Sequence, residues 1–359
     1  MHFRQIFSIA FVGLCGFIGL AAYAQSAQAV ETLTSRLESL LPANEQAGVA
    51  VGLVEAGEVT MTFVGNSDFS EETRFEYGSI TKLFTAILLA QLVDEGVISL
   101  NESINLYLPE EVQDPKWDVV TFGQLATHSA GLPETPLNMS TLVFQGGDEA
   151  RSTYDKAMLY EAVREVEPGS TGGLVRYSNF GFGLLGQLLT NVTQTSYADL
   201  IQTRLFTPLD MKGATLRGRR SDVDAAPLTS EGDVAVTWDA NALASAGAAR
   251  GNLNDALKFL EASMSACGES TPLAMANCRA QQATEIKGIY WEGQGLGWHL
   301  SESPNGDIVW HNGATRGFRS FLGFSAKKDT GIVLLANVRR MDVTGAGLEF
   351  LASLKGHTP

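Results

Sequence analysis

One helical segment constrains the fold of this chain more than any other stretch. It runs from Phe75 to Gly96 and reads FEYGSITKLFTAILLAQLVDEG. A turn at Tyr77 and Gly78 leads into apolar side chains that recur every three or four residues, the spacing of one helix face; they are Ile80, Leu83, Phe84, Ile87, Leu88 and Leu92. The pattern predicts a helix from Ile80 onward that buries one face against a core.

Two chemically active side chains stand at the start of this helix. Ser79 and Lys82 are three residues apart, so one helical turn places the hydroxyl and the amine on the same side. A serine becomes a nucleophile when a neighbour removes its proton, and a lysine can do so only if its pKa is lowered. The positive end of the helix dipole disfavours the protonated amine and favours an oxyanion beside Ser79. We therefore interpret Ser79 as a nucleophile and Lys82 as its base; an N-cap serine beside a surface lysine is the alternative.

The same four-residue pattern occurs a second time, from Ser325 to Lys328. The residues before it alternate like a strand, and Lys-Lys-Asp-Thr-Gly reads as a hairpin turn. We expect these side chains to lie in a solvated loop without a catalytic role.

The first 29 residues have the pattern of a secretory signal peptide. A short basic start is followed by an apolar run and by two small-x-small sites, Ala22-Tyr23-Ala24 and Ala27-Gln28-Ala29. Because the apolar run over residues 6–24 is nearly long enough to span a membrane, an uncleaved anchor is the alternative. We expect cleavage, a periplasmic or secreted mature chain over residues 30–359, and no membrane span after cleavage.

The composition fits an exported globular enzyme. The 359 residues include 40 acidic and 25 basic side chains, and the net charge of -15 argues against nucleic acid as a partner. A mature part of roughly 330 residues can bury a large core and form two lobes. Once the signal is removed, Cys267 and Cys278 remain, and a cysteine pair in an exported protein indicates a disulfide. Two free buried thiols are the alternative.

Strand-like segments lie at both ends of the chain, and helical segments lie between them. Residues 48–64 read as a hairpin, and residues 308–311, 318–325 and 331–337 read as short strands before a closing helix. We therefore expect one sheet built from both ends. A sheet lobe would span about 30–100 and 245–359, and an inserted helical lobe about 101–244. A site would lie in the cleft between the lobes, and the oligomeric state stays open.

Two further short motifs carry groups that could act on a substrate. Tyr177 can shuttle a proton if nearby cations lower its pKa, and Asn179 can donate to a substrate carbonyl and accept from a lysine. The alternative is an Asn179 N-cap after a packed aromatic ring. His311 and Gly313 close a strand along whose edge a substrate could lie. No metal-ligand spacing, Gly-x-Ser-x-Gly elbow or phosphate-binding loop occurs in the sequence, so we expect neither a metal nor a cofactor.

Three short motifs, taken in order, resemble those of the superfamily that contains class C β-lactamases, serine D-alanyl-D-alanine peptidases and related esterases: Ser79-x-x-Lys82, Tyr177-x-Asn179 and His311-x-Gly313. The resemblance extends over most of the mature chain, through YGSITKLFTA, LATHSAGLP, RYSNFGFGLLG, LFTPLDMKGATL, GQGLGWHL, HNGATRGFRSF and GIVLLAN. It implies an α+β fold in which an antiparallel sheet is flanked by helices and joined to an inserted all-helical lobe.

The resemblance also implies catalytic roles. Ser79 would be the acylated nucleophile, while Lys82 and Tyr177 would share the general base and acid work in an order that the sequence leaves open. The backbone N–H groups of Ser79 and Ala314 would form the oxyanion hole. Asn179 would hold the acyl side chain and orient Lys82.

Two departures from class C β-lactamases bear on the substrate. His311-Asn312-Gly313 stands where those enzymes carry Lys-Thr-Gly, so His311 would line the opposite wall of the cleft with a group that is only partly charged near neutral pH. Glu134-Thr135-Pro136 stands where they place an amide-binding glutamine. Both departures argue against rapid antibiotic hydrolysis.

Three functions follow from the resemblance. The leading one is an exported serine hydrolase that acts on β-lactam or D-Ala-D-Ala type amides, whose substrate is a small molecule or derives from peptidoglycan. A carboxylesterase with the same nucleophile is the first alternative. A penicillin-binding sensor or peptidoglycan-binding protein with negligible turnover is the second.

Overall fold

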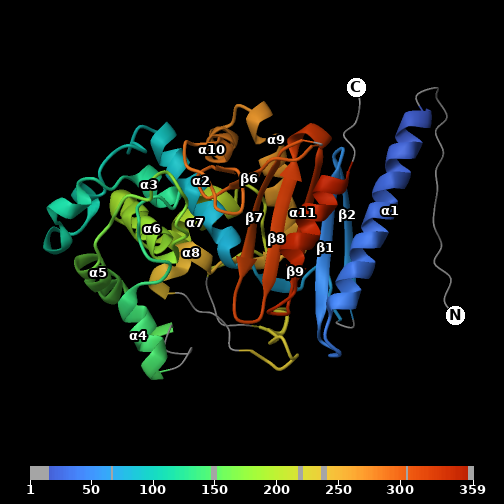
Figure 1. Cartoon of the computed structure of the whole chain (residues 1–359), viewed down its shortest axis with the longest axis horizontal. Helices are drawn as coiled ribbons and strands as arrows, with labels where there is room; N and C mark the ends of the chain where they lie inside the picture. The colour runs from blue at the N-terminus through green and yellow to red at the C-terminus, as the bar shows by residue number, and fades with distance from the viewer. Residues whose placement is uncertain are drawn as a thin grey trace.

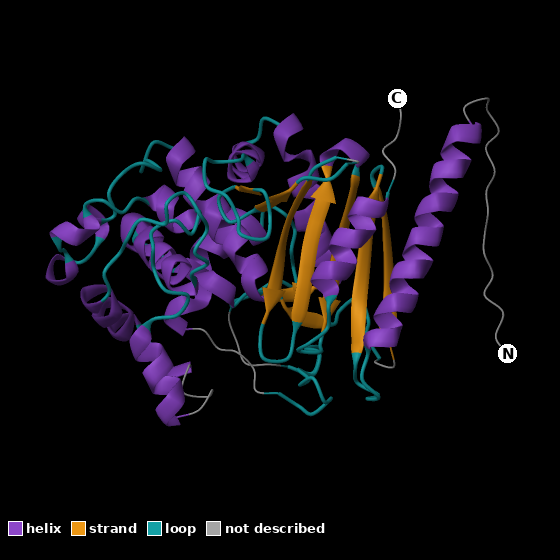
Figure 2. Ribbon diagram, in the orientation of Figure 1, coloured by secondary structure: helices purple, strands orange, loops and turns teal. Residues whose placement is uncertain are grey.

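The computed structural model describes residues 16–65, 68–146, 152–216, 221–235, 241–304 and 306–354. In this part of the chain, a helix-rich region stands beside a sheet whose outer face carries two more helices (Figure 1 and Figure 2). This arrangement confirms the predicted fold class, an antiparallel sheet flanked by helices. The first half of the predicted signal peptide, residues 1–15, lies outside the described residues.

The main sheet has seven strands in the order β2-β1-β9-β8-β7-β6-β5, and all neighbours run antiparallel. The strands are β1 (Gly48–Glu55), β2 (Glu58–Gly65), β5 (Gly293–Gln294), β6 (His299–Ser301), β7 (Ile308–Ala314), β8 (Arg319–Ser325) and β9 (Thr330–Ala336). A second sheet pairs β3 (Arg74–Glu76) with β4 (Arg250–Asn252). The three predicted late strands are β7, β8 and β9, whereas the sequence did not predict the second sheet.

The predicted first hairpin is confirmed. Strands β1 and β2 are joined by Ala56 and Gly57, whose φ angles are 51° and 79°. Two successive residues in the left-handed region form the tight turn that matches the twist of a hairpin.

The first and last strands of the sheet in chain order, β1 and β9, are direct neighbours. Val49 of β1 pairs with Ala336 of β9. Just after β9, the buried Asn337 side chain accepts from the Gly48 N–H at 2.9 Å and donates to the Gln46 carbonyl at 2.8 Å. One amide side chain therefore ties the two ends of the chain together.

Helices cover both faces of the sheet. Helix α9 (Leu253–Ser265) packs on one face, with α2 (Thr81–Asp94) beside it in the same hydrophobic core. Helix α11 (Val343–Ser353) packs on the other face, and α1 (Gly16–Leu40) packs on α11 and β2 (Figure 1).

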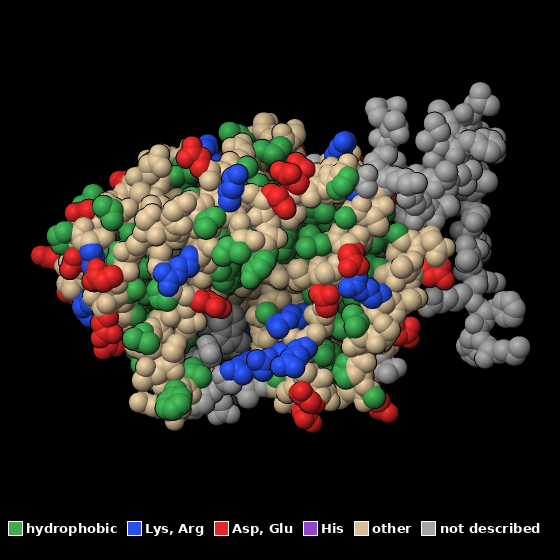
Figure 3. Space-filling model, in the orientation of Figure 1, with side chains coloured by type: hydrophobic (Ala, Val, Ile, Leu, Met, Phe, Trp, Pro, Cys, Tyr) green, Lys and Arg blue, Asp and Glu red, His purple; other side chains and the backbone are tan. Residues whose placement is uncertain are grey.

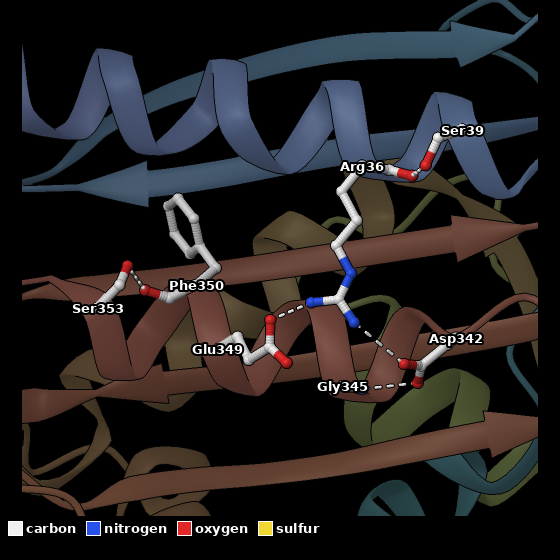
Figure 4. A network of polar contacts seen from close by, with 7 residues as sticks. All are labelled: Arg36, Ser39, Asp342, Gly345, Glu349, Phe350 and Ser353. Atoms are coloured by element: carbon white, nitrogen blue, oxygen red, sulfur yellow. Dashed lines mark hydrogen bonds and ion pairs between the residues drawn. The ribbon is translucent and has the colours of Figure 1, made fainter.

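Helix α1 runs without interruption across the predicted cleavage site after Ala29. Beyond that site, Leu37 is fully buried, and Arg36 binds the carboxylates of Asp342 and Glu349 at the start and on the surface of α11 (Figure 4). None of the described helices is long and apolar enough to cross a membrane.

The central helix α2 is buried on all sides, from Thr81 to Leu92. The prediction that it buries only one face is therefore wrong. The apolar stripe was real, but α2 lies against α6, α8 and α10, so its small and polar positions are enclosed as well. This central position holds the first turn of α2 at the boundary between the sheet and the helix-rich region.

The helix-rich region lies between α2 and α9 in the chain. Its α-helices are α3 (Phe122–Ala126), α4 (Leu137–Gly146), α5 (Lys156–Glu165), α6 (Asn179–Thr193), α7 (Tyr197–Ile201) and α8 (Ala244–Gly247). Helix α7 continues into a π-helical turn over residues 202–206. After α9, the chain forms α10 (Pro272–Gln281) before it returns to the sheet.

The second Ser-x-x-Lys copy is not solvated. Ser325 and Lys328 are both buried, and the Lys328 Nζ donates to the Leu351 carbonyl near the end of α11. The last carbonyls of a helix lack partners within the helix, and a lysine can satisfy one of them. The prediction of a solvated loop is therefore wrong, because the turn lies under α11.

The two remaining cysteines face each other. Cys267 follows α9 and Cys278 lies in α10, and their sulfur atoms are 2.05 Å apart. Geometry thus permits a covalent link between these two helices.

Candidate active site

Ser79 lies on a short 3-10 turn, η1 (Gly78–Ile80), that leads directly into α2. Gly78 has a φ angle of +54°, a conformation that glycine adopts without strain. The buried Tyr77 anchors the turn, since its hydroxyl donates to the Asn252 carbonyl at 2.7 Å. Ser79 itself is partly exposed, so a substrate can reach it.

Lys82 is fully buried beneath Ser79, at the second position of α2. Its Nζ lies 3.0 Å from the Ser79 Oγ, 2.7 Å from the Asn179 Oδ1 and 2.7 Å from the Ala246 carbonyl oxygen. Burial lowers the pKa of Lys82 well below its usual value, although the Glu134 charge acts in the opposite direction. Burial therefore favours the neutral form of the amine.

A neutral amine fits these three contacts. It has two hydrogens to donate and one lone pair, whereas an ammonium has three hydrogens. Asn179 Oδ1 and the Ala246 carbonyl can only accept, so they take the two hydrogens. The lone pair of Lys82 then faces the Ser79 hydroxyl, which is the arrangement of a base and its nucleophile.

Tyr177 approaches Ser79 from the other side, and its hydroxyl donates to the Ser79 Oγ at 2.7 Å. Burial raises the pKa of Tyr177; the hydrogen bond with Ser79 lowers it and the Glu134 charge raises it further. The condition that nearby cations lower this pKa is not met, because burial disfavours a phenolate. Tyr177 therefore holds its proton in the resting site.

Asn179 is the first residue of α6, but Ser178 caps the helix. The Ser178 hydroxyl accepts from the Gly181 N–H at 2.8 Å. The Asn179 side chain is thereby free to reach Lys82, and the alternative of an Asn179 N-cap is excluded.

The end of β7 lies beside Ser79. Strand β6 begins at His299, opposite Trp310, so in the described part of the chain no strand covers the β6 side of the last four residues of β7. A Cβ on Gly313 would lie 3.1 Å from the Ser79 backbone nitrogen, and a Cβ on Gly78 would lie 2.7 Å from the Ala314 backbone nitrogen. The two glycines therefore allow η1 and β7 to approach closely, which brings the N–H groups of Ser79 and Ala314 to one junction.

His311 forms the inner wall of this strand end. Its ring is buried and stacks on His299, with ring centroids 4.4 Å apart. Its Nδ1 lies 2.5 Å from the Asn312 carbonyl oxygen. Burial, followed by the positive charge that Lys82 carries when it is protonated, lowers the pKa of His311 to about 3. The expectation of a partly charged histidine is therefore wrong, because a ring so enclosed stays neutral at neutral pH.

The structure thus joins Ser79 and Lys82 by hydrogen bonds to Tyr177 and Asn179, which lie far from them in the sequence. The sequence reasoning missed two contributors, the Ala246 carbonyl and the Ser178 cap. It predicted the turn at Gly78 but not the close approach of this glycine to Ala314. The Ser178 cap had a local signal, a serine directly before the predicted helix. In the described ranges, no group of three or more His, Cys, Asp or Glu side chains could hold a metal ion.

Comparisons with known proteins identify the family of this chain. The model of a family described as Beta-lactamase matches residues 33–353. A β-lactamase of Escherichia coli (strain K12) is 26% identical over 334 residues, which cover 81% of this chain and 84% of that protein. The D-alanyl-D-alanine-carboxypeptidase/endopeptidase AmpH of Escherichia coli (strain K12) is 23% identical over 304 residues, 78% of this chain and 76% of AmpH.

A solved structure shares the fold. It is the crystal structure of a β-lactamase/D-alanine carboxypeptidase from Pseudomonas syringae, which superposes with a TM-score of 0.76 at 20% sequence identity. The match covers 91% of this chain and 98% of that one.

Proposed function

The chain belongs to the β-lactamase family, and from this premise we propose that it is a serine hydrolase that forms an acyl-enzyme on Ser79. One observation carries the proposal. The Ser79 Oγ lies 3.0 Å from the Lys82 amine, whose pKa is lowered by burial, and 2.7 Å from the Tyr177 hydroxyl. A base and a proton donor therefore already flank the nucleophile.

Lys82 is the base of the acylation step. The Ser79 proton passes to the Lys82 lone pair while the Oγ bonds to the substrate carbonyl carbon. The N–H groups of Ser79 and Ala314 stabilise the negative charge that develops on the carbonyl oxygen. The pKa directions support this assignment, since burial raises the pKa of Tyr177 and lowers the pKa of Lys82.

Tyr177 is the acid that completes the step. When the intermediate collapses, the leaving group takes the Tyr177 proton, and the Lys82 ammonium returns its proton to Tyr177. A water molecule then attacks the acyl carbon: it gives one proton to Lys82, its hydroxyl stays on the acyl group, and the released Ser79 Oγ recovers the proton. The resting protonation of both groups is restored.

We propose amides of the β-lactam or D-Ala-D-Ala type as substrates, with peptidoglycan fragments as one source. The carboxylesterase alternative has a specific observation in its favour, because the neutral His311 places no permanent cation at this point of the cleft wall. Asn179 would still orient Lys82 and contact the acyl side chain in either case. A binding protein with negligible turnover is the weaker alternative, since binding alone does not require a neutral base under the serine.

Ser79→Ala tests the nucleophile, with Ser325→Ala as the matched control. Both changes remove the serine of a Ser-x-x-Lys pattern, and the Ser325 hydroxyl has no hydrogen-bond partner among the described residues. We expect Ser79→Ala to abolish turnover and Ser325→Ala to retain it. The assays are a chromogenic cephalosporin, a D-Ala-D-Ala peptide and a p-nitrophenyl ester, each followed by intact mass spectrometry. Near-normal turnover by Ser79→Ala would refute the proposal.

The three substrates separate the alternatives. Turnover of the lactam or peptide, or a stable lactam adduct on Ser79, would support the first proposal. Ester turnover without a lactam adduct would support the carboxylesterase. A protein that reacts with none of them would leave the binding role as the better description.

We further propose that the chain is exported and that its signal peptide, residues 1–29, is removed. Cleavage after Ala29 would keep Leu33, Arg36 and Leu37, which hold α1 to the rest of the molecule. The mature N-terminus of the exported protein, read by mass spectrometry, tests this proposal. An N-terminus at Met1 would contradict it.

Two structural proposals accompany export. The first is a disulfide between Cys267 and Cys278, which would stabilise the fold by about 3 kcal/mol at most; alkylation with and without reductant tests it. The second is a division into a sheet lobe, about 30–100 and 245–359, and a helical lobe, about 101–244. Limited proteolysis tests that division, since cuts at the junctions would release the lobes as fragments.

A further inference from the structure

His128 packs against Tyr177, the proposed proton donor, and has no role in the steps described so far. The structure describes three histidines, all of them buried, and the face drawn in Figure 3 shows none: His128, His299 and His311. His128 lies just after α3 and is only 2% exposed. Its ring centroid is 4.5 Å from that of Tyr177 and 4.8 Å from that of Phe182. Any effect of His128 on the reaction must therefore act through the residues that it touches.

His128 holds the chain on both sides of Tyr177. Its carbonyl accepts from the Arg176 N–H at 2.8 Å, and its Nδ1 accepts from the Ser178 N–H at 3.0 Å. Its ring meets the Tyr177 ring at an interplanar angle of 32°. One residue therefore contacts three successive positions of the chain. The middle position carries the hydroxyl that donates to the Ser79 Oγ at 2.7 Å.

The hydrogen bond from Ser178 also assigns the tautomer of His128. Because Nδ1 accepts, it carries a lone pair, so the neutral ring has its proton on Nε2. This Nε2 is buried and has no hydrogen-bond partner among the described residues. A buried donor without a partner makes a fold less stable. The side chain is therefore not placed for its own hydrogen bonding at both nitrogens.

The backbone of His128 is unfavourable as well. Its φ angle is +57°, in the left-handed region that is uncommon for a residue with a side chain. The other non-glycine residues with positive φ angles in the described ranges are exposed: Ala56, Gln194, Asp210, Asn241 and Asp329. Backbone strain inside a protein persists where the surroundings hold it, and it is concentrated at functional sites. His128 thus combines a strained backbone with an unpaired donor, next to the group that donates to Ser79.

We propose that His128 is a positioning residue for Tyr177, which it holds where the phenol can pass its proton to the leaving group of the substrate. The inference rests on the proposed hydrolase function and adds a residue to it. An imidazole supplies a flat face for the Tyr177 ring and an acceptor for the Ser178 N–H, a combination that a phenyl or aliphatic side chain lacks. The left-handed backbone is the conformation in which the same residue also presents its carbonyl to Arg176.

Three variants separate the contacts of His128 in the full-length protein. His128→Phe keeps a flat ring beside Tyr177 but removes the acceptor for the Ser178 N–H. His128→Gln also removes that acceptor, since its longer side chain places the amide where Nε2 lies, and it serves if the phenylalanine variant does not fold. His128→Asn is the conservative variant: its Oδ1 can accept in place of Nδ1, and asparagine adopts the left-handed conformation more readily than most residues.

Two esters with unequal leaving groups give a kinetic readout. Phenyl acetate and 4-nitrophenyl acetate form the same acetyl-enzyme, so their kcat/KM values differ only in acylation, and the more basic phenolate depends more on a proton donor. We expect His128→Phe to lower kcat/KM for phenyl acetate by about tenfold or more relative to 4-nitrophenyl acetate, because a displaced Tyr177 no longer reaches the departing oxygen. Tyr177→Phe should show the full size of this selective loss, and His128→Asn should restore most of the wild-type ratio. A merely structural defect would lower both rates equally, and equal losses would contradict the inference.

An NMR measurement separates this inference from the proposed function, because it requires no turnover. Tyrosine isotope-labelled at Cζ reports the hydrogen bonding of each phenol, and the Tyr177 signal is the one that disappears in Tyr177→Phe. Ser79→Ala removes the partner of this phenol and should shift the signal. In the His128→Phe background the same Ser79→Ala change should shift it by less than half as much. A shift of undiminished size would overturn the inference while leaving the role of Ser79 untouched.

His299→Phe is the matched control for the NMR measurement. His299 is also only 2% exposed, and its ring neighbours in the described ranges do not include Tyr177: they are Trp291, Trp310 and His311. We expect Ser79→Ala to shift the Tyr177 signal in this background as it does in the wild type. A loss of the shift in both histidine variants would show that any buried substitution disturbs Tyr177, and the inference would fall.

Discussion

Acid should destabilise this protein through its buried histidines, and His311 allows the effect to be measured. The folded protein keeps His311 neutral, with a pKa of about 3, whereas an unfolded chain protonates histidine near pH 6.5. Between these two values the unfolded state binds a proton that the folded state does not bind. The free energy of unfolding must therefore fall as the pH falls from about 6.5 toward 3. Above about pH 7, His311 causes no such loss of stability.

The size of the effect follows from the two pKa values. A pH of 5 is about 1.5 units below the ordinary pKa of histidine. Protonation of one histidine therefore stabilises the unfolded state by about 2 kcal/mol at this pH. His128 and His299 are also buried, and burial lowers the pKa of each well below its usual value. Protonation of these two histidines in the unfolded state therefore acts in the same direction and adds to the loss.

Urea unfolding followed by tryptophan fluorescence at pH 7 and pH 5 measures the loss. The comparison of wild type with His311→Gln removes the contribution of all other titrating groups, because they are present in both proteins. We expect the loss of unfolding free energy between the two pH values to be about 2 kcal/mol smaller in the variant. Equal losses in the two proteins would show that His311 is not held neutral, and the reasoning from its burial would be wrong.

Three further predictions follow from the site and the sheet. Gly78→Ala should lower kcat by about 100-fold in the ester assay, because its Cβ would lie 2.7 Å from the Ala314 nitrogen and displace an oxyanion donor; an unchanged kcat would exclude that N–H from the site. Asn337→Ala should lower the free energy of unfolding in urea by about 3 kcal/mol, since it removes three buried hydrogen bonds; a loss below about 1 kcal/mol would contradict its role as a tie between the chain ends. The kcat/KM should rise with pH as Lys82 loses its proton and reach a plateau well below its usual pKa of about 10.4, because burial lowers that pKa; a rate that keeps rising to about pH 10 would contradict a neutral Lys82.

Local patterns in the sequence predicted the elements that local chemistry controls. The hairpin around Ala56 and Gly57 needed only alternating strands and a tight turn. The late strands β7 to β9 and the closing helix α11 had equally clear signals. The pairing of β1 with β9 could be predicted as well, because strands at both ends of a chain with helices between them must share a sheet.

Properties that depend on packing were predicted wrongly. The charge of His311 and the proton affinity of Tyr177 follow from how much protein surrounds them, and no local pattern encodes that enclosure. Lys328 was placed in solvent because its turn is polar, but α11 covers the turn and offers a carbonyl. The central α2 had an apolar stripe on one face, yet helices surround it completely.

Because β1 pairs with β9, the sheet beside the candidate site can form completely only after both ends of the chain have been made. Strand β1 can pair with β2 as soon as both strands have been made. Its other edge stays unpaired until β9 has been made, almost 300 residues later. Pairing across such a separation makes folding slow and leaves a strand edge exposed until the end. The turn that carries Ser79 likewise lacks its contact with β7 until β7 has been made. A chain that stops before β7 would contain Ser79 without the Ala314 N–H of the proposed oxyanion hole. The proposed activity therefore requires nearly the whole polypeptide.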